Sequence, residues 1–143
     1  MNRKYLLIGT CAVAAIAAYI TLHPVPVEDA AQSAPAEGNA MVAIQIPPIE
    51  GNVAIGQRIF ENACASCHGS NAVGVEGAGP PLIHIIYEPS HHADESFQRA
   101  VAMGVKSHHW QFGDMPPVEG LTRGDVAMVI DYIREIQRAN GIN

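Results

Sequence analysis

The pattern of apolar and polar positions predicts three helices in the second part of the chain. Apolar residues recur every three or four positions, the spacing that places them on one face of an α-helix. The predicted helices cover residues 53–62, 94–103 and 122–140. The last has the clearest start, because Thr122 and Asp125 have the Ser/Thr-x-x-acid form of a capping box. The pattern indicates an all-α domain.

A glycine inside the first predicted helix indicates close packing. Gly56 lies four residues before Phe60, and mid-helix glycine costs up to about 1 kcal/mol relative to alanine. Close approach of another helix would explain a glycine at this position. Tyr132 lies on a flank of the last predicted helix that could pack against Gly56 and Phe60. The alternative is that Gly56 belongs to a frayed first turn.

The N-terminal pattern is different, since Tyr5 to Leu22 is an uncharged apolar run. As a helix, this run would reach about 27 Å, which nearly spans a bilayer core. Arg3 and Lys4 precede it, so the excess of positive charge predicts a cytoplasmic N-terminus and an exported remainder. We expect residues 1–22 to be a transmembrane anchor or uncleaved signal in the bacterial inner membrane. A signal peptide cleaved after Ala17 is the alternative, and it would give a soluble periplasmic protein.

Residues 23–52 are rich in proline and alanine and carry only acidic charges, which is typical of a linker. Within them, the apolar run 41–46 could instead lie on the surface of the domain.

Residues 53–143 are the candidate domain, and their few aromatic residues provide little apolar volume for its core. Beyond residue 22 the chain has 6 basic and 14 acidic residues, a net charge of −8, which argues against nucleic-acid binding.

The candidate chemistry lies in the run Cys64-Ala65-Ser66-Cys67-His68. Two cysteines three positions apart share a helix face, so both sulfurs could form thioethers to one porphyrin, with His68 under the iron. The other cysteine of the chain, Cys11, lies in the apolar run, and a zinc site would lack a second ligand pair nearby. A thioredoxin-like redox pair would need a βαβ setting that is not evident. The run therefore predicts one covalently attached haem c, bound through Cys64 and Cys67, with His68 as an iron ligand.

Two further positions suit such a cofactor. Pro80 has a carbonyl that could accept the second ring N–H of His68, although it could also serve only as a rigid turn. Met115 lies between Gly113 and two prolines, which would present a weak thioether ligand to the iron. His108 and His109 are its rivals. Met103 and Met128 fall inside predicted helices, where we expect core positions.

Five histidines of the candidate domain remain without an assigned role, and imidazole suits copper and zinc. Paired histidines in loops are more often solvated, so this pattern alone favours no second metal. Trp110 could shield the cofactor or donate its N–H to a propionate. The five are His84, His91, His92, His108 and His109.

Together these segments resemble a class I cytochrome c. The resemblance covers about residues 53–143 and implies a small fold of three to four short helices around one haem. It also implies that the first and last helices cross through the glycine–aromatic contact, that Pro80 orients His68, and that Met115 is the sixth iron ligand. The run 108–110 departs from the family pattern. The matching segments are Gly56 with Phe60, Cys64 to Gly69, Gly79 to Leu82, Gly113 to Pro117, and Val129 with Tyr132.

The function expected from this reading is one-electron transfer in a periplasmic respiratory or oxidoreductase chain, without catalysis. Expected partners are a membrane oxidase, a cytochrome complex or a dehydrogenase. The domain could instead be a dedicated electron-accepting subunit of a dehydrogenase or copper enzyme, or a haem enzyme or gas sensor if Met115 is labile. The sequence does not specify the donor, the acceptor, the reduction potential or the oligomeric state.

Overall fold

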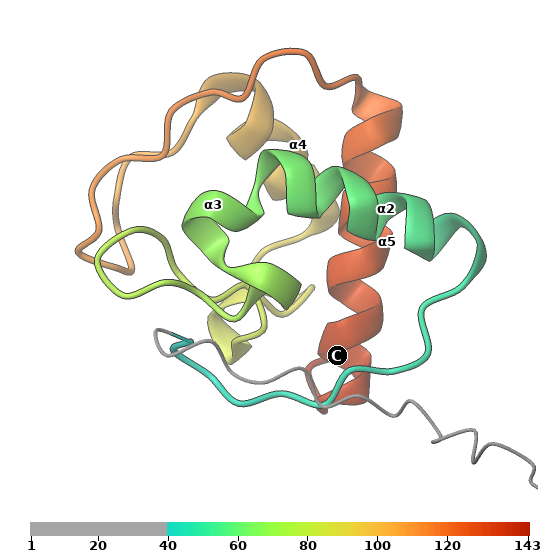
Figure 1. Ribbon diagram of the computed structural model, residues 1–143. Helices are drawn as coiled ribbons and strands as arrows, with labels where there is room; N and C mark the ends of the chain where they lie inside the picture. The colour runs from blue at the N-terminus through green and yellow to red at the C-terminus, as the bar shows by residue number, and fades with distance from the viewer. Residues whose placement is uncertain (1–39) are drawn as a thin grey trace, which may run out of the picture. The chain divides into compact units, whose positions relative to one another are not determined.

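The computed structural model describes residues 40–143, and this part of the chain is mostly helical (Figure 1). The three helices expected from the apolar pattern are present, and the first begins two residues early, at Gly51. Backbone pairing between extended segments of residues 40–143 is limited to isolated bridges, consistent with a cytochrome c fold. The elements are α2 (Gly51–Ala63), α3 (Ala65–His68), the 3-10 helices η1 (Ser70–Ala72) and η2 (Ile85–Tyr87), α4 (Asp94–Met103) and α5 (Arg123–Ala139).

Helices α2 and α5 cross in direct backbone contact (Figure 1). A Cβ atom at Gly56 would lie 1.9 Å from the carbonyl oxygen of Met128, so only glycine fits this crossing. Beside it, the buried rings of Phe60 and Tyr132 pack with centroids 5.6 Å apart. The predicted close approach is confirmed, and the alternative of a frayed first turn is wrong because Gly56 is buried in α2.

Helix α5 begins with the predicted capping box. The backbone N–H of Asp125 donates to the Thr122 hydroxyl at 3.2 Å, and the Asp125 carboxylate accepts from the Thr122 N–H at 2.9 Å. These bonds satisfy two of the N–H groups that a helix leaves unpaired at its start. One face of α5 then buries Val129, Ile133 and Ile136 in the core.

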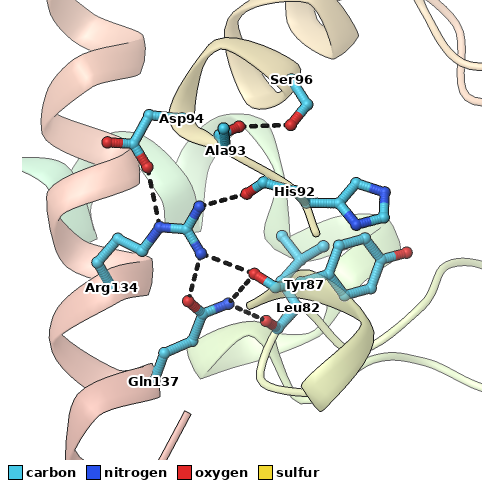
Figure 2. Close-up of polar contacts among 8 residues, drawn as sticks. All are labelled: Leu82, Tyr87, His92, Ala93, Asp94, Ser96, Arg134 and Gln137. Atoms are coloured by element: carbon cyan, nitrogen blue, oxygen red, sulfur yellow. Dashed lines mark hydrogen bonds and ion pairs between the residues drawn. The ribbon is translucent and has the colours of Figure 1, made fainter. Parts of the chain in front are cut away.

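Arg134 of α5 is buried although it is charged, and it fixes the segment between η2 and α4 (Figure 2). Its Nε donates to Asp94 Oδ1 at 2.9 Å. Its terminal nitrogens donate to the backbone carbonyls of Tyr87 at 2.7 Å and His92 at 2.5 Å, and to Gln137 Oε1 at 2.6 Å. We expect these bonds to hold the chain around His92 against α5, because a buried guanidinium needs every donor satisfied.

Residues 40–50, which the sequence assigns to the linker, lie against the helical domain. Ile44 and Ile49 pack on its hydrophobic core. The Gln45 N–H donates to Asn140 Oδ1 at 2.8 Å, and Asn140 Nδ2 donates back to the Gln45 carbonyl at 2.7 Å. The apolar run around Ile44 thus covers the end of α5, and the packed region begins before residue 53.

The predicted anchor at residues 1–22 and the first part of the predicted linker lie outside the described residues. Within residues 40–143, the helices are too short or too polar to cross a membrane.

Candidate functional site

The Cys64–His68 run consists of Cys64, which lies at the corner between α2 and α3, and the short helix α3. The Cys64 N–H donates to the Phe60 carbonyl at 2.8 Å, and the His68 N–H donates to the Cys64 carbonyl at 3.0 Å, so the run makes one helical turn. Neither Cys64 nor Cys67 is in a disulfide; the first is half-buried and the second is exposed. Both sulfurs therefore belong to one turn that begins at the end of the helix packed on α5.

The surroundings of the two thiols disfavour the alternative chemistries. Burial, helped by the neighbouring Cys67 and Glu61, raises the pKa of Cys64 to about 11, whereas a redox-active dithiol needs a lowered pKa. A zinc site would need its ligand atoms to converge, and the side chains of Cys64, Cys67 and His68 form no such cluster within residues 40–143. Covalent attachment of a cofactor remains as the chemistry that fits.

The imidazole of His68 is fixed by a backbone carbonyl. Its Nδ1 lies 2.9 Å from the carbonyl oxygen of Pro80, which is one of the two roles that the sequence leaves open for Pro80. A carbonyl only accepts, so Nδ1 carries the proton and Nε2 keeps its lone pair. Burial lowers the pKa of His68, partly opposed by this bond, and favours the neutral ring. Gly79 permits the approach, because a Cβ there would lie 2.6 Å from the Cys67 carbonyl oxygen.

A cavity of about 730 Å³ opens beside His68. This volume lies within the range of about 300–1,000 Å³ that cofactor and ligand sites occupy. Its walls come mainly from α4, α5 and the segment between them, and they include Cys64 and Pro80 but not Cys67. Much of the lining is apolar, including Phe60, Leu82, Phe97, Val129, Ile130 and Ile133.

Met115 lines the same cavity, on the segment between α4 and α5. Its backbone pairs with Val105, with both N–H···O distances at 2.9 Å. The Asp114 carboxylate accepts from the Ser107 N–H at 2.9 Å and forms an ion pair with Lys106 at 2.9 Å. These bonds close a loop of the chain, and the half-buried residue Met115 lies at the base of this loop.

The structure corrects the expectation for another methionine. The sequence predicts a core position for Met103, but this residue is 67% exposed and lines the cavity. The apolar positions of α4 face this cavity as well as the core, which the repeat alone cannot distinguish. Met128 is half-buried, on the flank of α5 that meets Gly56.

The residues present fit a haem. The Cys64 thiol, the neutral imidazole of His68 and the thioether residue Met115 line an apolar cavity, and the Cys67 thiol lies in the same turn as Cys64 but outside this lining. These are the ligand types of c-type cytochromes. The buried indole N–H of Trp110 has no hydrogen-bond partner of normal geometry among the described residues. It lies near enough to the Tyr87 hydroxyl to oppose the rise that burial gives the pKa of Tyr87. A carboxylate entering the cavity could satisfy this N–H, which is the role that the sequence suggests for Trp110.

Four of the five histidines without an assigned role line this cavity. His91 and His92 precede α4, and His108 and His109 lie in the segment that carries Met115. The sequence gives no sign of their convergence, because pairs 17 residues apart meet only through the fold. His84 lies apart from these four, with its ring against Trp110.

Comparison with known families identifies the domain. The family model "Cytochrome c" matches residues 53–137, more than half of the 143 residues. Comparisons with curated proteins and with solved structures gave no significant match. The family implies covalently attached haem c, and its domains typically transfer electrons rather than catalyse reactions. The chain belongs to the cytochrome c family.

Proposed function

We propose that this protein is a class I cytochrome c that carries single electrons with one haem per chain. The observation that carries the proposal is the orientation of the His68 ring, which the Pro80 carbonyl fixes so that one ring nitrogen keeps a free lone pair. This ring follows Cys64 and Cys67 in the same turn, and it lines the same cavity as Met115. When bound, haem c supplies an iron that alternates between the ferric and ferrous states.

Different side chains would attach the cofactor, bind its iron and orient the iron ligand. Cys64 and Cys67 bind it covalently through their sulfur atoms. His68 Nε2 and Met115 Sδ would bind the haem iron, and the Pro80 carbonyl would set the orientation and basicity of the imidazole. If both side chains bind the iron, no ligand position remains for oxygen or peroxide, which supports a carrier rather than an enzyme.

The location proposed for the domain is the periplasmic face of the bacterial inner membrane. The support is the apolar run of residues 5–22 after Arg3 and Lys4. A tether would raise the effective concentration of the domain toward a membrane oxidase, a cytochrome complex or a dehydrogenase. Residues 53–143 have 6 basic and 10 acidic residues, a net charge of −4, so a basic partner surface would be favoured and salt should slow the encounter.

The test is to produce the chain in a bacterium that attaches haem c and to measure the mass of the denatured protein. We expect one haem per chain that resists extraction into acidified organic solvent, and a potentiometric titration that fits one electron. A Cys64→Ala, Cys67→Ala double variant should lose covalent haem, whereas Ser66→Ala, in the same turn, should keep it. Wild-type protein that releases its haem on extraction would contradict the proposal.

A further inference from the structure

Three imidazoles outside the proposed haem ligands converge. One ring nitrogen from each of His91, His92 and His109 lies within 4.8 Å of the other two. In one pair, His91 Nε2 and His109 Nε2 are 3.4 Å apart. Two nitrogens bound at about 2.0–2.1 Å to a tetrahedral ion are separated by about 3.3–3.4 Å, so this pair already has the spacing of two metal ligands. A hydrogen bond between the two rings would explain the pair but not the third histidine.

The cluster is oriented as ligating histidines usually are. His92 Nδ1 lies 2.6 Å from the Ile86 carbonyl, which assigns its proton to Nδ1 and leaves Nε2 as a ligand atom. Ligating histidines commonly donate their other N–H to such an acceptor. The carbonyl of His92 accepts from the buried Arg134, so α5 holds the backbone of this ligand in place (Figure 2).

The surroundings favour neutral imidazoles, the form that binds metals. The pKa of His92 is lowered, first by burial and then by the charges of His91, His108 and Arg134, while its bond to Ile86 opposes this. The pKa of His109 is lowered by desolvation and by the neighbouring histidines. A bound metal ion fits this arrangement, because each neutral ring can turn a nitrogen lone pair, rather than a proton, toward the ion.

The ligand set limits the kind of ion. Imidazole nitrogens suit copper and zinc, whereas magnesium and calcium need oxygen ligands. Three protein ligands leave a fourth position for water or for His108, whose ring centroid is 4.3 Å from that of His109. We propose that His91, His92 and His109 bind one copper or zinc ion, separate from the haem iron. The ion joins the segment before α4 to the segment that carries Met115.

The test uses haem-loaded protein stripped with a chelator and dialysed separately against Zn²⁺ and Cu²⁺, with bound metal and iron counted by mass spectrometry. We expect one added ion per iron for at least one of the two metals, and binding to only one would identify the ion. His91→Ala and His109→Ala should each weaken binding at least about tenfold. Because both side chains are exposed, these variants should fold and keep the covalently attached haem, so that binding can be counted per iron.

The matched control is His84→Asn, which removes a histidine outside the cluster. Its side-chain oxygen can replace His84 Nδ1 as the acceptor from the Ile86 N–H. This variant should bind the ion as the wild type does. Substoichiometric binding of both metals would overturn the proposal, as would stoichiometric binding that survives both alanine substitutions. A changed haem ligand spectrum in His109→Ala would also overturn it, by making His109 an iron ligand.

Discussion

Replacing Gly56 by alanine perturbs the contact on which α2 and α5 cross. The added Cβ would lie 1.9 Å from the Met128 carbonyl oxygen and 2.5 Å from its carbon, both of them backbone atoms. Ordinary contacts between such atoms need about 3.5 Å, so the helices must separate by more than about 1 Å. Rotation of a side chain cannot relieve the clash. The substitution should therefore loosen the packing of Phe60 on Tyr132 as well.

The magnitude follows from two opposing effects. Overpacking a core costs about 1–3 kcal/mol, and a backbone obstacle places Gly56→Ala at the upper end. Alanine regains up to about 1 kcal/mol of helix propensity. The net loss in the free energy of unfolding should be about 2 kcal/mol. For a domain of this size, each kcal/mol lowers Tm by about 4–8 °C.

The assay is denaturant and thermal unfolding of the haem-loaded protein, followed by the helical circular dichroism signal. Gly124→Ala is the matched control, because a Cβ in that first turn of α5 would meet only the Thr122 hydroxyl oxygen at 3.6 Å, an ordinary contact. It should not reduce stability. If Gly56→Ala proves as stable as the wild type, the helices do not cross at the distance described and the reasoning fails.

Other substitutions test the remaining supports of the fold. Arg134→Leu should cost about 3 kcal/mol in the free energy of unfolding, because it leaves the His92 carbonyl and Gln137 Oε1 without their donor and removes one of the two donors to the Tyr87 carbonyl. Arg138→Leu, which removes an exposed ion pair, should change this free energy by less than about 1 kcal/mol. Thr122→Ala should cost about 1 kcal/mol through the lost helix cap. The hydrogen bonds from Thr122 hold the pKa of Asp125 below its ordinary value, so its carboxylate stabilises the fold above that value, and this contribution is lost as the pH falls through the lowered pKa. Asp125→Asn should therefore be less stable than the wild type at neutral pH and should approach it in acid, as denaturant unfolding at the two pH values will test.

The sequence predicts local features of this domain well. The three longer helices follow from apolar spacing, and the α5 cap follows from a four-residue pattern. For Pro80 the sequence leaves open an acceptor for His68 or only a rigid turn, and the structure shows the carbonyl of Pro80 beside His68. Gly56 was informative because its cost in a helix needed a reason.

Features that depend on distant parts of the chain were missed. The burial of Arg134 is not evident from the sequence, because three of its acceptors lie 40 or more residues earlier in the chain. The convergence of His91 and His109 needs the fold that joins two loops. The predicted core position of Met103 is wrong, because an apolar helix position can face a cofactor cavity as well as a core.

The absorption spectrum of the oxidised, haem-loaded protein at the red edge of the visible range tests the central claim most directly. Ferric haem with a thioether ligand has a weak charge-transfer band at this edge, which two histidine ligands do not give. The account predicts the band in the wild type and in His109→Ala, its loss in Met115→His, and a lower reduction potential in that variant. A wild-type spectrum without the band, or a band that persists in Met115→His, would contradict the account.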